Sequence, residues 1–409
     1  GGPKRFKVKL KTLRIKMASS FTSLSFHMIT SIIFILTFSL ASPSNGATGT
    51  HDKRPFGKIY AFGDSFTDTG NTDSSTGQSV PAIFTYVSNP PYGSTFFHHP
   101  TNRYSDGRLV IDFVAQALSL PYLPPYRNKK ADKSHGVNFA VAGSTAISYD
   151  FFVENNLILD RTPESLQTQL TWFNKFLEDQ EGCTEPTTTP ECCRSAFDDA
   201  LIWVGEIGAN DYGYNIGSSV PATTIQQLAI KSVTGFLLAL LSKGAKYVVV
   251  QGLPTTGCLT LAKIFSPLEA RDDIGCVESM NKQSYSHNAI LQSKLQDLRT
   301  QFPNAVIIYA DYYNAYRAVM KNPTEYGFEE LFEVCCGSGG GPYNFDLLAV
   351  CGSPSSTACP NPSQYINWDG AHLTEAMYKV VSDSFLNGTT SHPPFHYLLS
   401  KKQHSAGMN

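Results

Sequence analysis

One serine in this sequence has the local setting of a catalytic nucleophile. Ser65 follows the apolar run Lys58–Phe62, which we predict to be a buried strand, and precedes a segment that we expect to be helical. A serine hydroxyl attacks a carbonyl carbon only when a base accepts its proton, and a histidine oriented by a carboxylate is a common base of this kind. The alternative is that Ser65 serves only as the cap of that helix.

The required pair of aspartate and histidine occurs twice with the spacing D-x-x-H. Asp132 and His135 lie in a charged run, which predicts a solvated loop, whereas Asp369 and His372 lie between Trp368 and a final predicted helix. The second setting predicts a partly buried position. We therefore predict that His372 is the base and that Asp369 orients it. His135 is expected to be exposed and away from the site.

Two further loops offer hydrogen-bond donors for an oxyanion, the negatively charged oxygen that forms during acyl transfer. Gly143 follows the apolar run Val137–Val141, and glycine lets a backbone N–H approach a ligand closely. Asn210 follows the run Ala200–Val204 and offers a side-chain amide. The alternative for both residues is an ordinary turn, because glycine and asparagine are common in turns. The backbone N–H of Ser65 is the third candidate donor.

Five short apolar runs alternate with helix-length segments along the chain. The runs are Lys58–Phe62, Val137–Val141, Ala200–Val204, Tyr247–Gln251 and Val306–Ala310. The predicted helices cover 108–118, a segment that starts at Thr162 and Pro163 and reaches Phe176, 224–241, 277–299 and about 373–386. This alternation predicts an α/β fold in which helices cover both faces of a five-stranded parallel sheet. All the candidate residues then lie at the carboxyl edge of the sheet, where ligands bind.

We predict that the chain consists of a leader at 1–47, one domain at 48–398 and a polar tail at 399–409. Within the domain, 71–106 and 321–368 are rich in Gly, Pro, Asn and Ser and are expected to be long surface loops. Four aromatic residues in the first loop are candidates either for a substrate pocket or for simple loop packing. They are Tyr86, Tyr92, Phe96 and Phe97.

The leader has the pattern of a signal peptide, with its natural start at Met17. Residues 1–16 hold seven Lys and Arg and no acidic residue, and residues 17–47 hold no charged residue. The uncharged run Met28–Ala41 is too short to span a bilayer, which needs about 20 residues, and small residues follow it as at an export cleavage site. A membrane anchor or a buried helix is the alternative. We predict secretion.

The remaining chain is acidic and contains all nine cysteines. Its 25 Lys and Arg against 34 Asp and Glu argue against a nucleic-acid-binding protein. Many cysteines in an exported chain favour disulfides, and no C-x-x-C pair is present. Local pairing predicts Cys258–Cys276, one bond within 183–193, two within 335–359, and one free thiol. Asn387 begins an N-x-T tripeptide and is a predicted glycosylation site.

Four segments of the chain, in order, resemble the conserved blocks of the plant GDSL esterases and lipases in the SGNH hydrolase superfamily. The segments are Phe62–Ser65 with Asp68–Asn71, Asn138–Ser144, Gly208–Asp211, and Trp368–Thr374. Ala142 and Ala209 stand where the family often has glycine, and neither change removes a donor. The Gly205–Gly208 lead-in is similar to the branch that holds sinapine esterase and acetylajmalan esterase.

This resemblance, which runs from Ile59 to about Leu386, implies a three-layer α/β/α sandwich of the flavodoxin-like SGNH type. It also implies a serine esterase, secreted to the apoplast or delivered to the vacuole, that acts on small plant-metabolite esters or lipids. Ser65, His372 and Asp369 are its expected catalytic residues, and the N–H groups of Ser65 and Gly143 with the Asn210 amide form the oxyanion hole.

The serine mechanism requires no cofactor and no metal, and we expect a small-molecule ester as the partner. The acidic composition and the short apolar run of the leader predict no nucleic acid and no permanent membrane anchor. Two other functions stay open on the sequence. One is an acyltransferase that uses the same acyl-enzyme, and the other is a non-catalytic cell-wall interaction protein.

Overall fold

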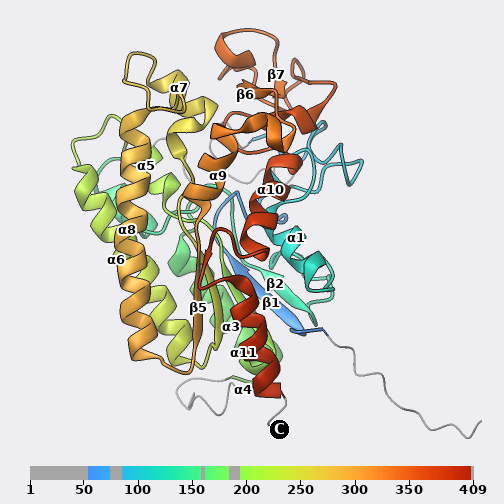
Figure 1. The fold of residues 1–409 in the computed structure, drawn as a ribbon, viewed down its shortest axis with the longest axis vertical. Coiled ribbons are helices and arrows are strands. Elements are labelled where there is room, and N and C mark those ends of the chain that lie inside the picture. The colour runs from blue at the N-terminus through green and yellow to red at the C-terminus, as the bar shows by residue number, and fades with distance from the viewer. Residues whose placement is uncertain (1–53, 74–84, 158–161, 184–193, 407–409) are drawn as a thin grey trace, which may run out of the picture. The chain divides into compact units, whose positions relative to one another are not determined.

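The five predicted runs form the parallel part of one central sheet (Figure 1). The computed structural model describes residues 54–73, 85–157, 162–183 and 194–406, so the predicted leader lies outside the described residues. The parallel strands are β1 (Lys58–Phe62), β2 (Gly136–Asn138), β3 (Ala200–Val204), β4 (Tyr247–Gln251) and β5 (Val306–Ala310). The strand order is β10-β5-β4-β3-β1-β2, and the short edge strand β10 (Ser391–His392) pairs antiparallel with β5.

Four of the five parallel strands have the predicted bounds, and the second ends early. β2 stops at Asn138, where we expected the strand to continue to Val141. The Asn138 side chain accepts a hydrogen bond from the Ala140 N–H at 2.8 Å and donates to the Thr67 carbonyl at 2.6 Å. A side chain that bonds to nearby backbone in this way competes with the regular ladder of the strand.

Helices cover both faces of the sheet, which confirms the predicted three-layer sandwich. One face packs against α3 (Leu166–Glu181), α6 (Ala222–Ser242) and α8 (Glu278–Gln301), with the shorter α2 (Tyr149–Glu154), α4 (Arg194–Asp198) and α5 (Ala209–Asn215). The other packs against α1 (Val110–Ala117), α9 (Tyr312–Lys321), α10 (Glu375–Leu386) and α11 (Phe395–Ala406). Along β1, Tyr60 and Phe62 lie in the first core, and Ile59 and Ala61 lie in the second. Both faces of the strand are therefore buried, as its unbroken apolar sequence requires.

The predicted start of α3 at Thr162 and Pro163 is wrong. The helix begins at Leu166, and Ser165 is its N-cap in a capping box with Thr168. Thr162 is buried and donates its hydroxyl proton to the Ala142 carbonyl at 2.6 Å. Its side chain therefore fixes a neighbouring loop and is not available to cap the helix.

The long segments 85–106 and 321–368 are more than surface loops. The second contains β6 (Glu330–Val334) paired with β9 (Tyr365–Asn367), and β7 (Cys336–Gly337) paired with β8 (Thr357–Ala358). Side chains from both segments form a third, smaller core. Its members are Val87, Tyr92, Tyr104, Ala142, Cys335, Cys336, Cys351 and Trp368. This core packs against the loop that follows β2, so it lies at the carboxyl edge of the sheet.

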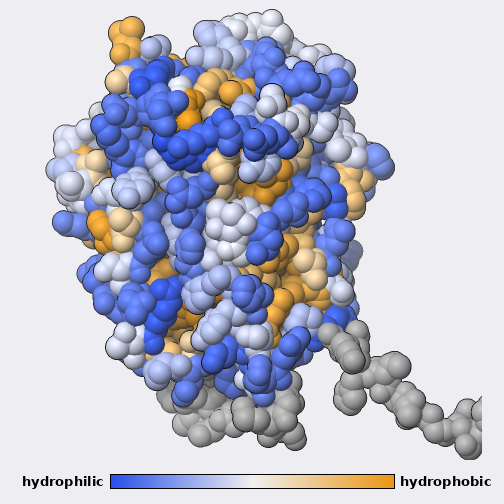
Figure 2. Space-filling view, viewed as in Figure 1, coloured by the Kyte–Doolittle hydropathy of each residue, from blue (hydrophilic) through white to orange (hydrophobic). Residues whose placement is uncertain are grey.

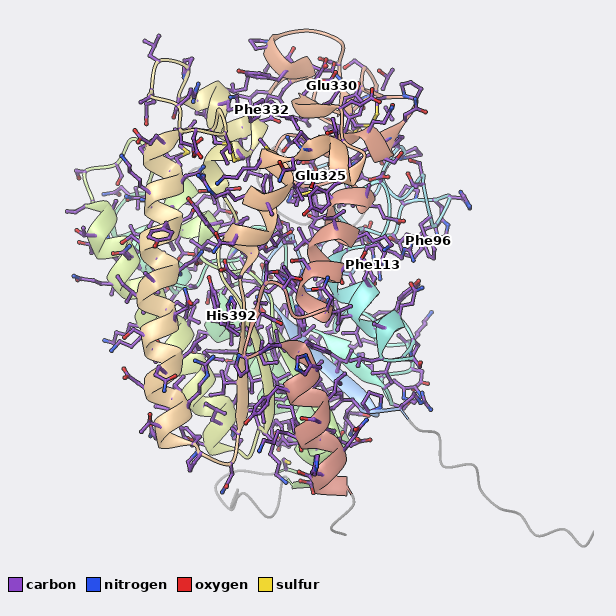
Figure 3. All side chains as sticks on the ribbon, in the orientation of Figure 1. Phe96, Phe113, Glu325, Glu330, Phe332 and His392 are labelled. Carbon is purple, nitrogen blue, oxygen red and sulfur yellow. A yellow bond between two sulfur atoms is a disulfide. The ribbon has the colours of Figure 1, made fainter. Side chains whose placement is uncertain are left out.

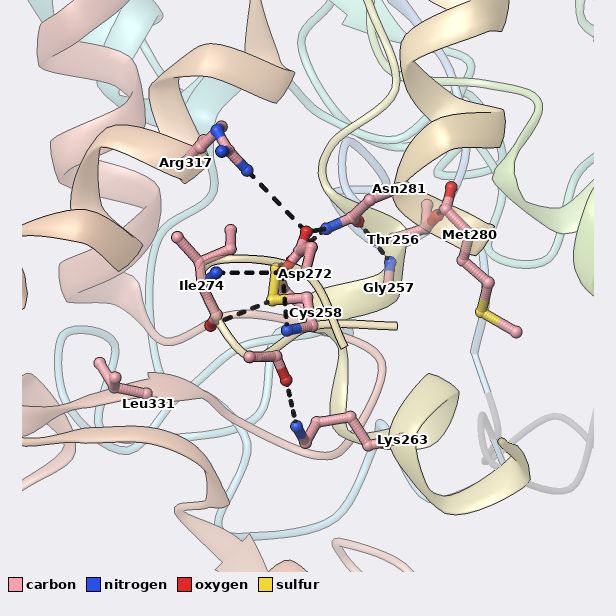
Figure 4. Close-up of a disulfide and its surroundings, with 12 residues drawn as sticks. Thr256, Gly257, Cys258, Lys263, Asp272, Ile274, Met280, Asn281, Arg317 and Leu331 are labelled. Carbon is pink, nitrogen blue, oxygen red and sulfur yellow. Dashed lines mark hydrogen bonds and ion pairs between the residues drawn. A yellow bond between two sulfur atoms is a disulfide. The ribbon is translucent and has the colours of Figure 1, made fainter. Parts of the chain in front are cut away.

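Three disulfides agree with the predicted local pairing. They join Cys258 to Cys276, Cys335 to Cys359, and Cys336 to Cys351. Cys183 is also disulfide-bonded, and the rest of the predicted 183–193 pair lies outside the described residues. Figure 4 shows the first of these bonds and the polar groups around it, including the Asn281 amide, which donates to Asp272 at 2.7 Å.

One helix among the described residues is long and apolar enough to cross a membrane by length and composition. This helix is α6, and 44% of its most apolar 18-residue stretch is buried inside the protein. Its side chains Ile230, Phe236 and Leu240 belong to the core beneath the sheet, so the apolar composition has a packing role. Hydrophilic residues predominate on the face shown in Figure 2, with hydrophobic residues in small areas between them. The predicted polar tail at 399–409 begins inside α11, which continues to Ala406.

Candidate active site

Ser65 lies in a tight turn directly after β1 and is 2% exposed. The helix that we expected after it is not formed. Asp64 organises the turn, because its side chain accepts from the Phe66 N–H at 3.0 Å and its carbonyl accepts from Thr67 and Asp68 at 3.0 and 2.9 Å. A carboxylate that accepts a hydrogen bond from a backbone N–H two residues later favours a turn over a helix. The turn holds Ser65 at the carboxyl edge of the sheet.

Asp68 ties this turn to the second candidate loop. One of its carboxylate oxygens accepts from the N–H groups of Gly70 and Asn71 at 2.8 and 2.6 Å. The other accepts from Thr72 and from Ala142 at 3.0 Å each. The Ala142 N–H is thereby used in holding the loop, and the next residue, Gly143, remains as the backbone donor.

Gly143 occupies a position that only glycine fills without strain. Its φ is +77°, and an added Cβ would lie 2.4 Å from Thr162 Oγ1 and 2.9 Å from the Tyr214 hydroxyl oxygen. The Tyr214 hydroxyl donates to the Gly143 carbonyl at 2.9 Å, which fixes the peptide. Among the described residues, no protein acceptor takes the N–H of Gly143 or of Ser65. Both donors are thus available to a bound group.

Asn210, near the start of α5, connects the three candidate loops. Its amide nitrogen donates to Asp64 Oδ2 at 2.9 Å and to the Ser144 carbonyl at 3.0 Å. The neighbouring Asp211 accepts from the Ala146 and Ile147 N–H groups at 2.8 Å each. The structure therefore places Asn210 beside the turn that holds Ser65, at the edge of the sheet where we expected it. It also gives both amide hydrogens a partner within the protein, which the sequence did not indicate.

Three buried carboxyl groups surround this junction and were not singled out from the sequence. Burial, together with Glu206, raises the pKa of Asp64 well above its usual value. Burial also raises the pKa of Glu206 to about 7 and that of Asp211 to about 7. Among the described residues, no group of three or more His, Cys, Asp and Glu side chains is placed to hold a metal ion.

Asp369 and His372 form a buried pair with the geometry of an oriented imidazole. His372 Nδ1 lies 2.8 and 2.9 Å from the two Asp369 carboxylate oxygens, and the His372 N–H donates to Oδ1 at 2.9 Å. Burial alone raises the pKa of Asp369, but the His372 imidazole and the hydrogen bonds from His372 and Tyr92 outweigh it. The pKa of Asp369 therefore lies below its usual value, and the group is a carboxylate at neutral pH.

The His372 ring lies beside the turn that holds Ser65. Its centroid is 5.6 Å from that of Phe66, the residue after Ser65, and 4.6 Å from that of Tyr104. The His372 carbonyl accepts from the Trp368 N–H at 2.8 Å, which closes the D-x-x-H turn. The structure thus brings Ser65, Gly143, Asn210, Asp369 and His372 to one edge of the sheet.

The other D-x-x-H lies at the opposite edge. His135 Nδ1 is 2.9 Å from the carbonyl oxygen of Gly57, which immediately precedes β1, and Asp132 accepts from Ser134. His135 is therefore away from Ser65, as predicted. It is half-buried where we expected exposure, because its ring packs against the beginning of β1.

Tyr92 is a residue of the site that the sequence left undecided between pocket lining and loop packing. Its hydroxyl donates to Asp369 Oδ2 at 2.8 Å, and the residue is 1% exposed. The sequence held no sign that this loop reaches Asp369. Phe96 and Phe97 instead pack against one another and against Tyr122.

The sequence that forms this site matches a known protein family. Residues 59–385 match the family described as GDSL-like Lipase/Acylhydrolase. The chain belongs to this family. The match includes all four blocks, and the family is one of carboxylic ester hydrolases.

Plant members of the GDSL family are similar over almost the whole chain. A GDSL esterase/lipase of Arabidopsis thaliana is 54% identical over 382 residues, which cover 92% of this chain and 97% of that protein. Acetylajmalan esterase of Rauvolfia serpentina is 39% identical over 346 residues, covering 82% and 86%. Among solved structures, an acetylxylan esterase of Geobacillus stearothermophilus covers 81% of this chain and 92% of its own. Its identity of 12% and TM-score of 0.35 are too low to bear on function.

Proposed function

We propose that this GDSL-family protein is a secreted serine esterase that cleaves carboxylic esters through an acyl-enzyme. The observation that carries the proposal is the buried contact of 2.8 Å between His372 Nδ1 and Asp369, beside the turn that holds Ser65. With Nδ1 turned to the carboxylate, Nε2 is the ring nitrogen that faces the reaction. It accepts the proton of the Ser65 hydroxyl as Ser65 Oγ bonds to the ester carbonyl carbon.

The resulting oxyanion is held by the N–H groups of Ser65 and Gly143 and by the Asn210 amide. When the tetrahedral intermediate collapses, the bond to the alcohol oxygen breaks and His372 protonates the leaving alcohol. Water then attacks the acyl-enzyme with His372 again acting as base, and the acid and free Ser65 are released. Asn210 exchanges one of its two protein acceptors, Asp64 or the Ser144 carbonyl, for the oxyanion.

The substrate class is inferred from the relatives. Acetylajmalan esterase, at 39% identity, supports small esters of plant metabolites, with lipid esters as the broader family alternative. Secretion is supported by three disulfides, since such bonds persist in oxidising compartments. Asn387 is the C-cap residue directly after α10 and is exposed, which supports the proposed glycan there.

The test compares four forms of the chain against acetyl, short-chain, long-chain and hydroxycinnamoyl esters. Ser65→Ala and His372→Ala are expected to lose turnover, and Ser65→Ala also loses labelling by a serine-directed phosphonate. His135→Ala, which changes the other D-x-x-H, is the matched control and keeps parent activity. Turnover retained in Ser65→Ala would refute the mechanism. Transfer of the acyl group to an added alcohol in preference to water would identify an acyltransferase.

A further inference from the structure

A single buried hydrogen bond joins two segments that lie 277 residues apart. The Tyr92 hydroxyl donates to Asp369 Oδ2 at 2.8 Å. His372 Nδ1 lies 2.8 Å from the same oxygen and 2.9 Å from Oδ1, and Oδ1 also accepts the N–H groups of Ala371 and His372. Tyr92 is therefore the one donor in this set that comes from outside the D-x-x-H turn.

The direction of the Tyr92 hydroxyl is set by its surroundings. The ring meets those of Tyr104 and Trp368 edge-on, with centroids 6.0 Å away in each case. The Tyr92 N–H donates to the Asn89 carbonyl at 3.2 Å, and the next N–H, of Gly93, donates to Ser105 at 3.0 Å. Backbone and ring are both fixed, so the hydroxyl is held in place before any substrate binds.

The loop that carries Tyr92 is also fastened to the helix that follows His372. The Arg108 guanidinium lies over the rings of Phe96 and Phe113, at 3.8 and 4.4 Å, and both residues lie on the side of α1 and α10 in Figure 3. It donates to Glu375 Oε1 at 2.8 Å, and the Arg108 N–H donates to Oε2 at 2.7 Å. Glu375 is the first residue of α10. The loop that carries Tyr92 and the segment that carries Asp369 are therefore held together by these contacts as well.

We infer that Tyr92 is a positioning residue of the ester-cleaving site, which holds the Asp369 carboxylate against His372 by donating a hydrogen bond to Oδ2. This inference rests on the proposed function. A tyrosine hydroxyl stabilises the carboxylate most when the imidazole is neutral, because the imidazolium itself compensates the negative charge. Loss of the hydroxyl therefore favours protonation of the pair and moves the acidic limb of the pH–rate profile to higher pH.

Other ionisable groups around the pair stay in place in such a variant. Tyr104 faces Asp369 from the same loop as Tyr92, and Tyr378 faces it from α10. Asp64 faces His372 from the nucleophile turn. Since none of these groups changes when Tyr92 becomes phenylalanine, a shift of the profile reports on the Tyr92 hydroxyl.

The test compares Tyr92→Phe with Tyr316→Phe on the full chain. Tyr316 is a buried residue of α9 whose hydroxyl has no hydrogen-bond partner among the described residues, so its loss is the matched control. In Tyr92→Phe we expect kcat/KM to fall by roughly tenfold and the acidic limb to rise by about half to one pH unit. The low-field proton resonance of His372 Nδ1–H is expected to move as well. The parent profile and resonance are expected in Tyr316→Phe.

A profile and a resonance identical to the parent in Tyr92→Phe would overturn the inference. If that variant does not fold, 3,5-difluorotyrosine introduced at position 92 keeps the ring and makes the hydroxyl a stronger donor. The acidic limb is then expected to move to lower pH, and an unchanged limb overturns the inference. Ser65→Ala separates the two claims. Turnover that survives in Ser65→Ala refutes the serine mechanism, whereas an inactive Ser65→Ala beside an unshifted Tyr92→Phe refutes only the role of Tyr92.

Discussion

The backbone N–H of Leu261 donates to the carbonyl oxygen of Gly370 at 2.9 Å, between Asp369 and His372. Leu261 lies in α7 (Thr260–Phe265), within the loop that the Cys258–Cys276 disulfide closes. The turn that carries Asp369 and His372 is therefore held by a disulfide-closed loop from a distant part of the chain. This relationship has a direct consequence for stability.

Replacing both Cys258 and Cys276 by alanine is expected to destabilise the protein by about 3 kcal/mol, the usual value for a closed loop of this size. The two sulfur atoms are buried, so the loss has both a chain-entropy and a packing part. Thermal melts of the variant and the parent measure the effect. The turnover of the folded variant is expected to fall too, because the support at Gly370 is loosened. An unchanged melting temperature would contradict this account.

Gly143→Ala and Gly182→Ala form a matched pair of variants that tests the proposed role of the Gly143 N–H. Both glycines have positive φ, +77° and +68°, so each alanine is expected to cost about 1 kcal/mol in strain. Among the described residues, nothing around Gly182 lies within 4 Å of an added Cβ, whereas at Gly143 the Cβ meets Thr162 Oγ1. Only Gly143→Ala is therefore expected to displace its N–H and lower kcat. Equal kcat in the two variants would show that this N–H does not take part in catalysis.

Asn210→Ala is expected to lower kcat by roughly 10²–10³ with little change in KM, because an oxyanion donor acts mainly in the transition state. A loss of about 1–3 kcal/mol in stability should accompany it, since Asp64 and the Ser144 carbonyl lose a donor. Asn215→Ala is the control. Its amide donates to Val220 within the same region of the chain, so that variant should lose stability and keep kcat. Steady-state kinetics beside a melt distinguish these results. Near-parent kcat in Asn210→Ala would assign Asn210 a structural role alone.

Glu206→Gln is expected to change how stability depends on pH. The pKa of about 7 for Glu206 in the folded protein lies above that of a carboxyl in an unfolded chain, roughly 4. Between these values the folded state keeps a proton that the unfolded state has released, so stability falls as the pH rises from about 4 to 7. Glutamine removes this contribution, and the melting temperature should decline less from pH 5 to pH 8.

A slope remains in Glu206→Gln because Asp211, with a pKa of about 7, contributes in the same direction. Glu178→Gln, at an exposed position of α3, is the control and should keep the parent slope. Melts at four pH values between 5 and 8 are sufficient. A parent-like slope in Glu206→Gln would show that this carboxyl is ionised in the folded state across that range.

The local sequence was sufficient to predict the strands of the parallel sheet and the contact between Asp369 and His372. β1, β3, β4 and β5 have the predicted bounds because each is a short run of β-branched and aromatic residues that buries both faces. The contact between Asp369 and His372 needs only a spacing of three residues and a tight turn. Cys258 and Cys276 pair within a single loop, so their bond was also predictable from separation along the chain.

Other features depended on which loops the sheet brings together. The local pattern of Ser65 suggested a following helix, but Asp64 bonds to the next N–H groups and forms a turn. Which D-x-x-H lies beside Ser65 is decided by the tertiary fold. His135 contacts Gly57, before β1, whereas the His372 ring lies 5.6 Å from that of Phe66, after β1. The Tyr92–Asp369 bond spans 277 residues. Contacts of this kind depend on strand order and side-chain packing, which no local pattern of residues encodes, and for that reason only the tertiary structure revealed them.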